Sequence, residues 1–162
     1  MAVEGPKRPL QVIERIRQAT DAHDLEALVD CFAVDVVSEQ PVHPERSFRG
    51  RDQIRQNWGR IFGAVPDLRA QLLRSAEAGA TAWAEWEWTG TRVDGAPHLM
   101  RGVTIIEASE GRVALTRFYM EPVAMDGLDV RAAIERTVGS ASPAATTPSA
   151  ASAATDGPGS GR

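Results

Sequence analysis

The stretch TAWAEWEWTG, residues 81–90, decides how this chain folds and raises the question of which of its sides is buried. Three tryptophans alternating with small and acidic residues, just before a glycine, favour a β-strand over a helix. Successive side chains of a strand point to opposite faces, so Trp86 and Trp88 lie on one side and Glu85 and Glu87 on the other. The fold must therefore accommodate an aromatic face and two carboxylates on the same strand.

The composition is that of one ordinary domain, with 162 residues, 43% hydrophobic and 25% charged. The net charge of -4 with interspersed signs offers no basic stripe, and no segment has the apolar length of a membrane span. We therefore expect neither nucleic acid nor a membrane as a partner. Charges near the N-terminus argue against a secretory signal and predict a cytoplasmic protein. The single cysteine, Cys31, follows Leu28 at helical spacing, which indicates a buried structural thiol.

Hydrophobic periodicity predicts helices first and strands later. The apolar residues of segments 10–16, 25–32 and 54–62 recur at helical spacing, and Asp24 is placed to cap the second helix. A short extended piece, DVVSEQPVHP, separates the second helix from the third. A last short helix is expected over residues 130–138, after Asp129.

From Leu68 onward the period changes to two, which predicts four antiparallel strands separated by Gly79, Asp94-Gly95 and Glu110-Gly111. Two-residue turns at the last two sites predict these cross-strand rows: Glu85-Thr104-Arg117, Glu87-Gly102-Tyr119 and Thr89-Met100-Glu121. A turn that is longer by one residue would change these face assignments.

The predicted domain spans residues 9–138, between an N-terminal arm of residues 1–8 and a C-terminal tail of residues 139–162. The tail consists mainly of Ala, Ser, Thr, Pro and Gly. Such a segment cannot bury enough apolar surface to offset the entropy of ordering, so we expect it to be disordered.

Two interpretations of the charged face follow. In the first, the tryptophans pack on the helices, and the glutamates form a solvated face with weak surface ion pairs. In the second, the charged side lines a concave pocket and the apolar side contacts a second subunit. The periodicity alone does not choose between them.

Four segments resemble the SnoaL-like members of the nuclear transport factor 2-like superfamily: AHDLEALVDCFAVDVV, FRGRDQIRQNW, EWEWTGTRVDG and RGVTIIEASEGRVALTRFYMEPV. The resemblance covers roughly Val12 to Val123. It implies an α+β fold in which a cone-shaped, strongly bent antiparallel sheet wraps around about three N-terminal helices. It also implies that the open end of the cone receives a largely apolar small molecule, and that the charged row lines the cone.

Relatives in this superfamily include polyketide cyclases, ketosteroid isomerases and limonene epoxide hydrolases, most of which use carboxylates or a histidine as acid and base. By similarity to the epoxide hydrolases, RFYME maps an acidic catalytic position onto Glu121, and EWE maps another onto Glu87. Glu39 falls on the position of an Asn that helps to hold water. A carboxylate in an apolar cavity can exchange protons near neutral pH because burial raises its pKa.

The resulting hypothesis is carboxylate-based acid/base catalysis (cyclase, isomerase or epoxide hydrolase) on a hydrophobic, polyketide-like or terpenoid-like substrate. The expected catalytic residues are Glu87, Glu121, Arg117 and Tyr119. The expected substrate-binding residues are Glu39, Trp58, Trp83, Glu85, Met100 and His43. The alternative is a noncatalytic ligand-binding or dimerisation module.

No metal site and no cofactor are predicted, because the sequence lacks a His and Cys cluster at ligand spacing and a glycine-rich phosphate loop. The expected partners are a hydrophobic small molecule and a second copy of the chain. The outer sheet face expected to make that homodimer contact comprises Trp86, Trp88, Phe118 and Met120.

Overall fold

The computed structural model of the protein describes residues 8–125 and 127–139. The chain divides into two units, Met1–Ala124 and Met125–Arg162. Apart from Arg8 and Gly139, the predicted N-terminal arm and C-terminal tail lie outside the described residues.

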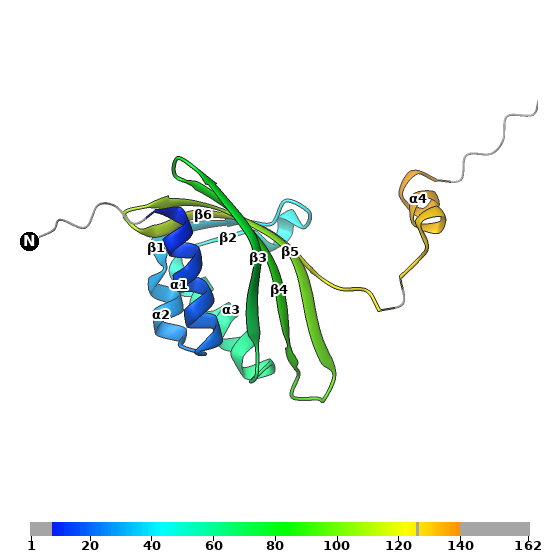
Figure 1. The fold of residues 1–162 in the computed structure, drawn as a ribbon, viewed down its shortest axis with the longest axis horizontal. Coiled ribbons are helices and arrows are strands. Elements are labelled where there is room, and N and C mark those ends of the chain that lie inside the picture. Colours follow the sequence, from blue (N-terminus) through cyan, green and yellow to red (C-terminus); the bar gives the residue numbers. More distant parts are fainter. Residues whose placement is uncertain (1–7, 126, 140–162) are drawn as a thin grey trace, which may run out of the picture. The chain divides into compact units, whose positions relative to one another are not determined.

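The first unit contains three α-helices and a six-stranded sheet (Figure 1). Its elements follow the order α1 (Pro9–Asp21), α2 (Leu25–Asp30), β1 (Phe32–Glu39), a 3-10 turn (Pro44–Arg46), β2 (Phe48–Arg49), α3 (Arg51–Ala64), β3 (Arg69–Ala78), β4 (Thr81–Thr91), β5 (Pro97–Ser109) and β6 (Arg112–Pro122). The second unit holds α4 (Val130–Val138).

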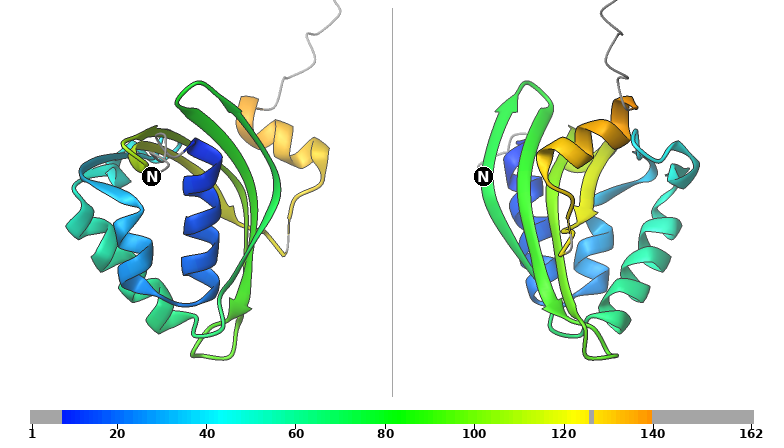
Figure 2. Two further views of the ribbon diagram at one scale, coloured as in Figure 1. Left: turned by 60° about the vertical axis from the view of Figure 1, so that its left-hand side comes forward. Right: turned by 90° about the vertical axis from the view of Figure 1, so that its right-hand side faces the viewer.

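The strands lie in the order β2-β1-β6-β5-β4-β3. All neighbours are antiparallel except β1 and β6, which are parallel, so the sheet is mixed rather than wholly antiparallel as expected. The sheet is strongly curved, and α1, α2 and α3 lie on its concave side (Figure 2). The α+β architecture expected from the sequence is confirmed.

The predicted helices form where capping and apolar spacing coincide. Pro9 begins α1, where its missing N–H leaves no helical hydrogen bond unmade. Asp24 caps α2 by accepting a hydrogen bond from the backbone N–H of Ala27 at 2.9 Å, and Asp129 caps α4 in the same way. The second helix is shorter than expected, because the chain becomes extended at Phe32 and begins β1.

The predicted strand registers are wrong by one residue, for two separate reasons. Between β4 and β5 the connection is the five-residue loop 92–96 and not a two-residue turn, so that Glu87 pairs with Arg101. Between β5 and β6 the two-residue turn at Glu110-Gly111 does form, with positive φ at both residues. A bulge just beyond it then shifts the register, and Arg101 pairs with Glu121.

These two shifts exchange the faces of β5 only, because β4 and β6 are separated by both of them. The charged residues of β4 and β6 therefore share a face, as predicted. Arg101 and Val103 join that face in place of Gly102 and Thr104.

Gly102 lies where β5 and β6 approach most tightly. Its φ is 153°, and a Cβ atom there would lie 2.2 Å from the carbonyl oxygen of Tyr119 and 2.7 Å from the Cα of Met120. Both contacts are with backbone and cannot be relieved by rotating a side chain. The sheet therefore requires glycine at this position.

The tryptophan face is the inside of the fold. Trp86, Trp88 and Met120 are 2%, 5% and 2% exposed, and they belong to one apolar core with residues of the helices. The expectation that this face contacts a second subunit is therefore wrong, since the helices already cover it. Further members of the core are Val12, Ile13, Leu28, Val36, Ile54, Leu68, Ile106 and Val113.

Candidate functional site

A cavity of about 400 Å³ lies between α1, α3 and the concave face of the sheet. This volume is within the range of small-molecule sites. The lining residues are Ile13, Ile16, Phe32, Ser38, Gln40, Phe48, Ile54, Asn57, Trp58, Arg60, Ile61, Trp86, Trp88, Met100, Thr104, Ile106, Thr116 and Phe118. The cavity is predominantly apolar, because each element turns the hydrophobic side of its repeat towards it.

A row of aromatic rings crosses this cavity from helix to sheet. Trp58 of α3 lies 5.5 Å from Phe62 and 5.2 Å from Trp88 of β4, measured between ring centroids. Trp88 in turn lies 6.0 Å from Phe118 of β6. All three pairs are tilted rather than stacked, with interplanar angles of 54° to 60°, an arrangement that aromatic quadrupoles favour. Trp58, Trp88 and Phe118 thus form an aromatic wall that can contact a flat ring.

Apart from the indole N–H groups, the polar side-chain groups that line the cavity are neutral hydroxyls and amides and one guanidinium. Trp86 Nε1 donates a hydrogen bond of 2.9 Å to Thr104 Oγ1, which satisfies a buried indole N–H. Trp88 Nε1 is buried without a hydrogen-bond partner among the described residues. Gln40, Asn57 and Arg60 are half-buried or exposed and stand where the cavity meets solvent.

Among the described residues that line the cavity, none is Asp, Glu, His, Cys, Lys or Tyr. General acid/base catalysis near neutral pH needs a group whose pKa can be brought close to 7, and hydroxyls, amides and guanidinium groups lie far from it. The cavity can hold, orient and hydrogen-bond a ligand. It does not contain the carboxylate pair expected from the sequence.

Of the expected site residues, Trp58 and Met100 line the cavity. The residues Glu85, Glu87, Arg117, Tyr119 and Glu121 share a face, but it is the convex face of the sheet. The expectation that this charged row lines the cone is therefore wrong. Its physical reason is burial: β4 turns Trp86 and Trp88, not its glutamates, towards the helices.

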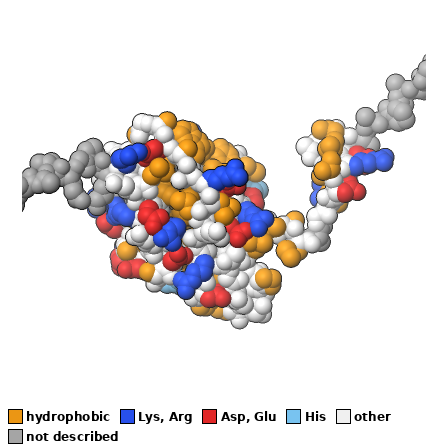
Figure 3. Space-filling model, viewed as in Figure 1, with side chains coloured by type: hydrophobic (Ala, Val, Ile, Leu, Met, Phe, Trp, Pro, Cys, Tyr) orange, Lys and Arg blue, Asp and Glu red, His pale blue; other side chains and the backbone are white. Residues whose placement is uncertain are grey.

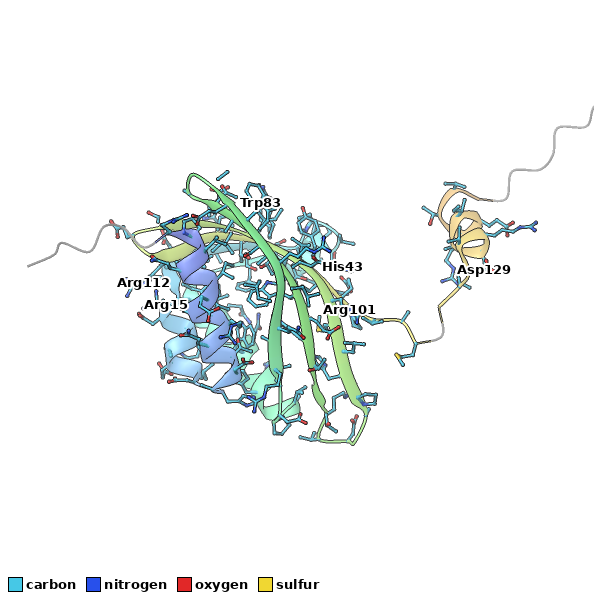
Figure 4. All side chains as sticks on the ribbon, in the orientation of Figure 1. Arg15, His43, Trp83, Arg101, Arg112 and Asp129 are labelled. Carbon is cyan, nitrogen blue, oxygen red and sulfur yellow. The ribbon has the colours of Figure 1, made fainter. Side chains whose placement is uncertain are left out.

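Trp83 lies on the same convex side and is 40% exposed. His43 and Arg101 also lie on this side, at the positions labelled in Figure 4. Glu39 is also outside the cavity, although its neighbours Ser38 and Gln40 line it, because adjacent residues of β1 point to opposite sides. Glu39 lines a separate surface groove between β1 and β2.

Charged and polar side chains contact one another across the convex face. Arg101 binds Glu87 at 2.5 Å, His43 Nε2 lies 2.9 Å from Glu121, and Arg117 donates to Glu39 at 2.8 Å. Opposite charges also adjoin one another on the face of the first unit that Figure 3 shows. Exposed pairs of this kind each contribute little to stability. This is the solvated charged face of the first interpretation.

Arg117 and His98 are among the ionisable groups of the sheet whose pKa values are shifted. The hydrogen bond to Glu39 raises the pKa of the Arg117 guanidinium, which fixes its positive charge. Burial lowers the pKa of His98 from its ordinary 6.5, and nearby Arg92 adds to the effect. The Nε2 atom of His98 is buried without a hydrogen-bond partner among the described residues, in keeping with this lowered pKa.

Sequence reasoning missed the polar residues of the cavity, chiefly Asn57, Arg60, Thr104 and Thr116. Asn57 and Arg60 lie three residues apart beside the apolar stripe of α3, so their helical spacing was the available signal. The burial of Thr104 and Thr116 could be predicted only with the correct strand register.

No cluster of three or more His, Cys, Asp or Glu suited to a metal ion occurs within residues 8–125 and 127–139. In the same part of the chain, no helix is long and apolar enough to cross a membrane. Cys31 is buried, as expected, and its Sγ lies 3.3 Å from the carbonyl oxygen of Ala27.

Residues 13–116 match the sequence profile of the SnoaL-like domain. No curated protein matches the chain significantly. Solved structures share its fold at low sequence identity. IdmH from Streptomyces antibioticus, a proposed polyketide cyclase, is 20% identical with a TM-score of 0.62, over 71% of this chain and 93% of that one.

Two further structures give the same picture. An LEH-like epoxide hydrolase of M. tuberculosis is 18% identical with a TM-score of 0.61, over 70% of this chain and 82% of the other. A hypothetical protein from Catenulispora acidiphila, with a ketosteroid isomerase-like fold and in complex with trimethylamine, is 16% identical with a TM-score of 0.60, over 70% and 87%. At these identities the similarity establishes the fold alone.

Proposed function

The chain belongs to the SnoaL-like domain family, and on that premise we propose that it binds a small, largely apolar, ring-containing molecule without acid/base catalysis. The ligand class is a polyketide-like or terpenoid-like compound. The observation that carries the proposal is the cavity of about 400 Å³, which has aromatic walls and no proton-exchanging side chain among its described lining residues.

The open cavity supports binding over a purely structural role. A dimerisation module would fill its interior with its own side chains, whereas the space between α3 and β4 stays open at the size of a ligand site. Trp58, Trp88 and Phe118 offer ring faces that are already fixed by their contacts with one another. A preformed wall lowers the entropy cost of binding.

The cavity chemistry favours the noncatalytic alternative over the acid/base hypothesis. The proposed catalytic pair, Glu87 and Glu121, lies on the other side of the sheet, where each carboxylate is bound by a partner, Arg101 or His43. A ligand in the cavity is separated from both by the strands themselves. The catalytic roles of these residues, and those of Arg117 and Tyr119, have no support from the cavity.

The direct test is to measure the binding of anthracene carboxamide, a neutral flat probe. Binding is monitored by energy transfer from the tryptophans to the probe. Trp58, Trp86 and Trp88 all line the cavity, so a bound probe quenches their emission. We expect a dissociation constant on the order of micromolar for a ligand of this size. The variant Thr116→Phe places a ring in the cavity and should weaken binding at least about tenfold, since the space is no longer available.

The matched control is Thr89→Phe, which adds the same ring at an exposed position of β4 outside the cavity. It should bind as the wild type does. Circular dichroism and cooperative thermal unfolding show that both variants are folded. Equal probe binding by Thr116→Phe, Thr89→Phe and the wild type would exclude the cavity as the binding site.

A further inference from the structure

Arg60 is a cation at the cavity that has no partner among the described residues. It is exposed, lies on α3 and lines the cavity. Within the described part of the chain it makes no ion pair and no side-chain hydrogen bond, whereas Arg55 on the same helix binds Glu26 and Arg51 lies 3.9 Å from Asp30. The two paired arginines fix the helix to α2. Arg60 is left available for a group that is not part of the fold.

Asn57 provides a second donor beside Arg60. It lies three residues earlier, on the same side of α3, and it also lines the cavity. Gln53 Nε2 donates to Asn57 Oδ1 at 2.8 Å, so the acceptor of this amide is already used and its N–H groups are left for another partner. Nothing in the described lining is negatively charged, so this side of the cavity offers donors to an incoming acceptor.

We propose that the ligand is an amphipathic anion, an apolar ring system that carries a carboxylate. The ring lies against Trp58 and Trp88, and the carboxylate meets the guanidinium of Arg60 and the amide of Asn57. Arginine binds a carboxylate through two parallel hydrogen bonds, which makes it better suited to this ligand than a point charge. This inference rests on the proposed function, because it names the ligand class of the same cavity.

The net charge of the chain shows where a preference for anions would have to arise. With a formal charge of -4, the protein as a whole repels anions, so a preference for an anionic ligand cannot come from its overall field. It has to come from a local cation. Because Arg60 is exposed, the contribution is moderate and falls as salt is added.

The test compares anthracene carboxylate with its neutral carboxamide, which share one ring system and differ in charge. The wild type should bind the carboxylate more tightly, and Arg60→Gln should weaken carboxylate binding about five- to twentyfold while changing carboxamide binding less than about twofold. Arg60→Lys should retain part of the preference, since the charge stays and the planar fork is lost. Raising the salt concentration should reduce the preference in the wild type and in Arg60→Lys, and should change little in Arg60→Gln.

The matched control is Arg55→Gln, which removes the same charge from the same helix at a residue outside the cavity. It should leave both affinities unchanged. Equal binding of the two probes by the wild type overturns the inference while the proposed function stands. The same holds if Arg60→Gln weakens both probes alike, or if Arg55→Gln matches its effect. If neither probe binds the wild type, the proposed function fails as well.

Discussion

Replacing Thr104 by valine should destabilise the protein through one identifiable hydrogen bond. Thr104 Oγ1 accepts from Trp86 Nε1 at 2.9 Å, and the two residues are 9% and 2% exposed. Valine keeps the shape of the side chain but removes the acceptor, so the indole N–H stays buried without a partner. Leaving such a donor unsatisfied costs about 1–3 kcal/mol.

In a domain of this size the change corresponds to a fall in Tm of about 3–15 °C, measured by differential scanning calorimetry or circular dichroism. Thr116→Val is the control, because Thr116 is 8% exposed, lines the same cavity and makes no side-chain hydrogen bond to a described residue. It should change the free energy of unfolding by less than about 0.5 kcal/mol.

A double-mutant cycle with Trp86→Phe isolates the bond, since phenylalanine removes the donor. The coupling energy between the two positions should be about 1–2 kcal/mol. If Thr104→Val costs no more than Thr116→Val, or if the coupling energy is zero, the reasoning is refuted, and water in the cavity satisfies the indole instead.

Three further predictions concern the fold and its charges. Gly102→Ala should lower the free energy of unfolding by about 3 kcal/mol or more, because the added Cβ would lie 2.2 Å from backbone. Gly95→Ala, which has positive φ but open space around it, should lower it by only about 1–2 kcal/mol. Denaturant unfolding of the two variants and the wild type measures the difference. His98 has a lowered pKa in the folded state, so on acidification the unfolded state takes up the proton first. Stability should therefore fall as the pH drops below 6.5, and His98→Gln should flatten that part of the pH profile. Glu87→Gln and Glu121→Gln should leave binding of anthracene carboxamide within about twofold of the wild type, because both carboxylates lie on the convex face; a larger loss would return them to the site.

The helices were predictable because each carries its own signal. Ile54, Trp58 and Ile61 recur on one side of α3, and Asp24 stands where α2 needs a cap. These are local patterns that need no knowledge of the rest of the chain. The same holds for the alternation in β4, which correctly separated Trp86 and Trp88 from Glu85 and Glu87.

The site was not predictable to the same degree, because it depends on how distant segments pair. A five-residue loop and a bulge each move the register by one residue, and neither has a distinctive sequence. Thr104 was consequently expected beside Glu85 on the charged face and lies instead beneath Trp86 on the inner one. The similarity to acid/base enzymes then favoured the charged face as the cavity lining, although burial of the tryptophans excludes it.

The most direct test of the central claim is a crystal structure of the protein with anthracene carboxamide bound. We predict the ring system in the cavity between α3 and the inner face of the sheet, in contact with Trp58, Trp88 and Phe118. A probe bound on the convex face beside Glu87 and Glu121, or a cavity closed by the protein's own side chains, would contradict it.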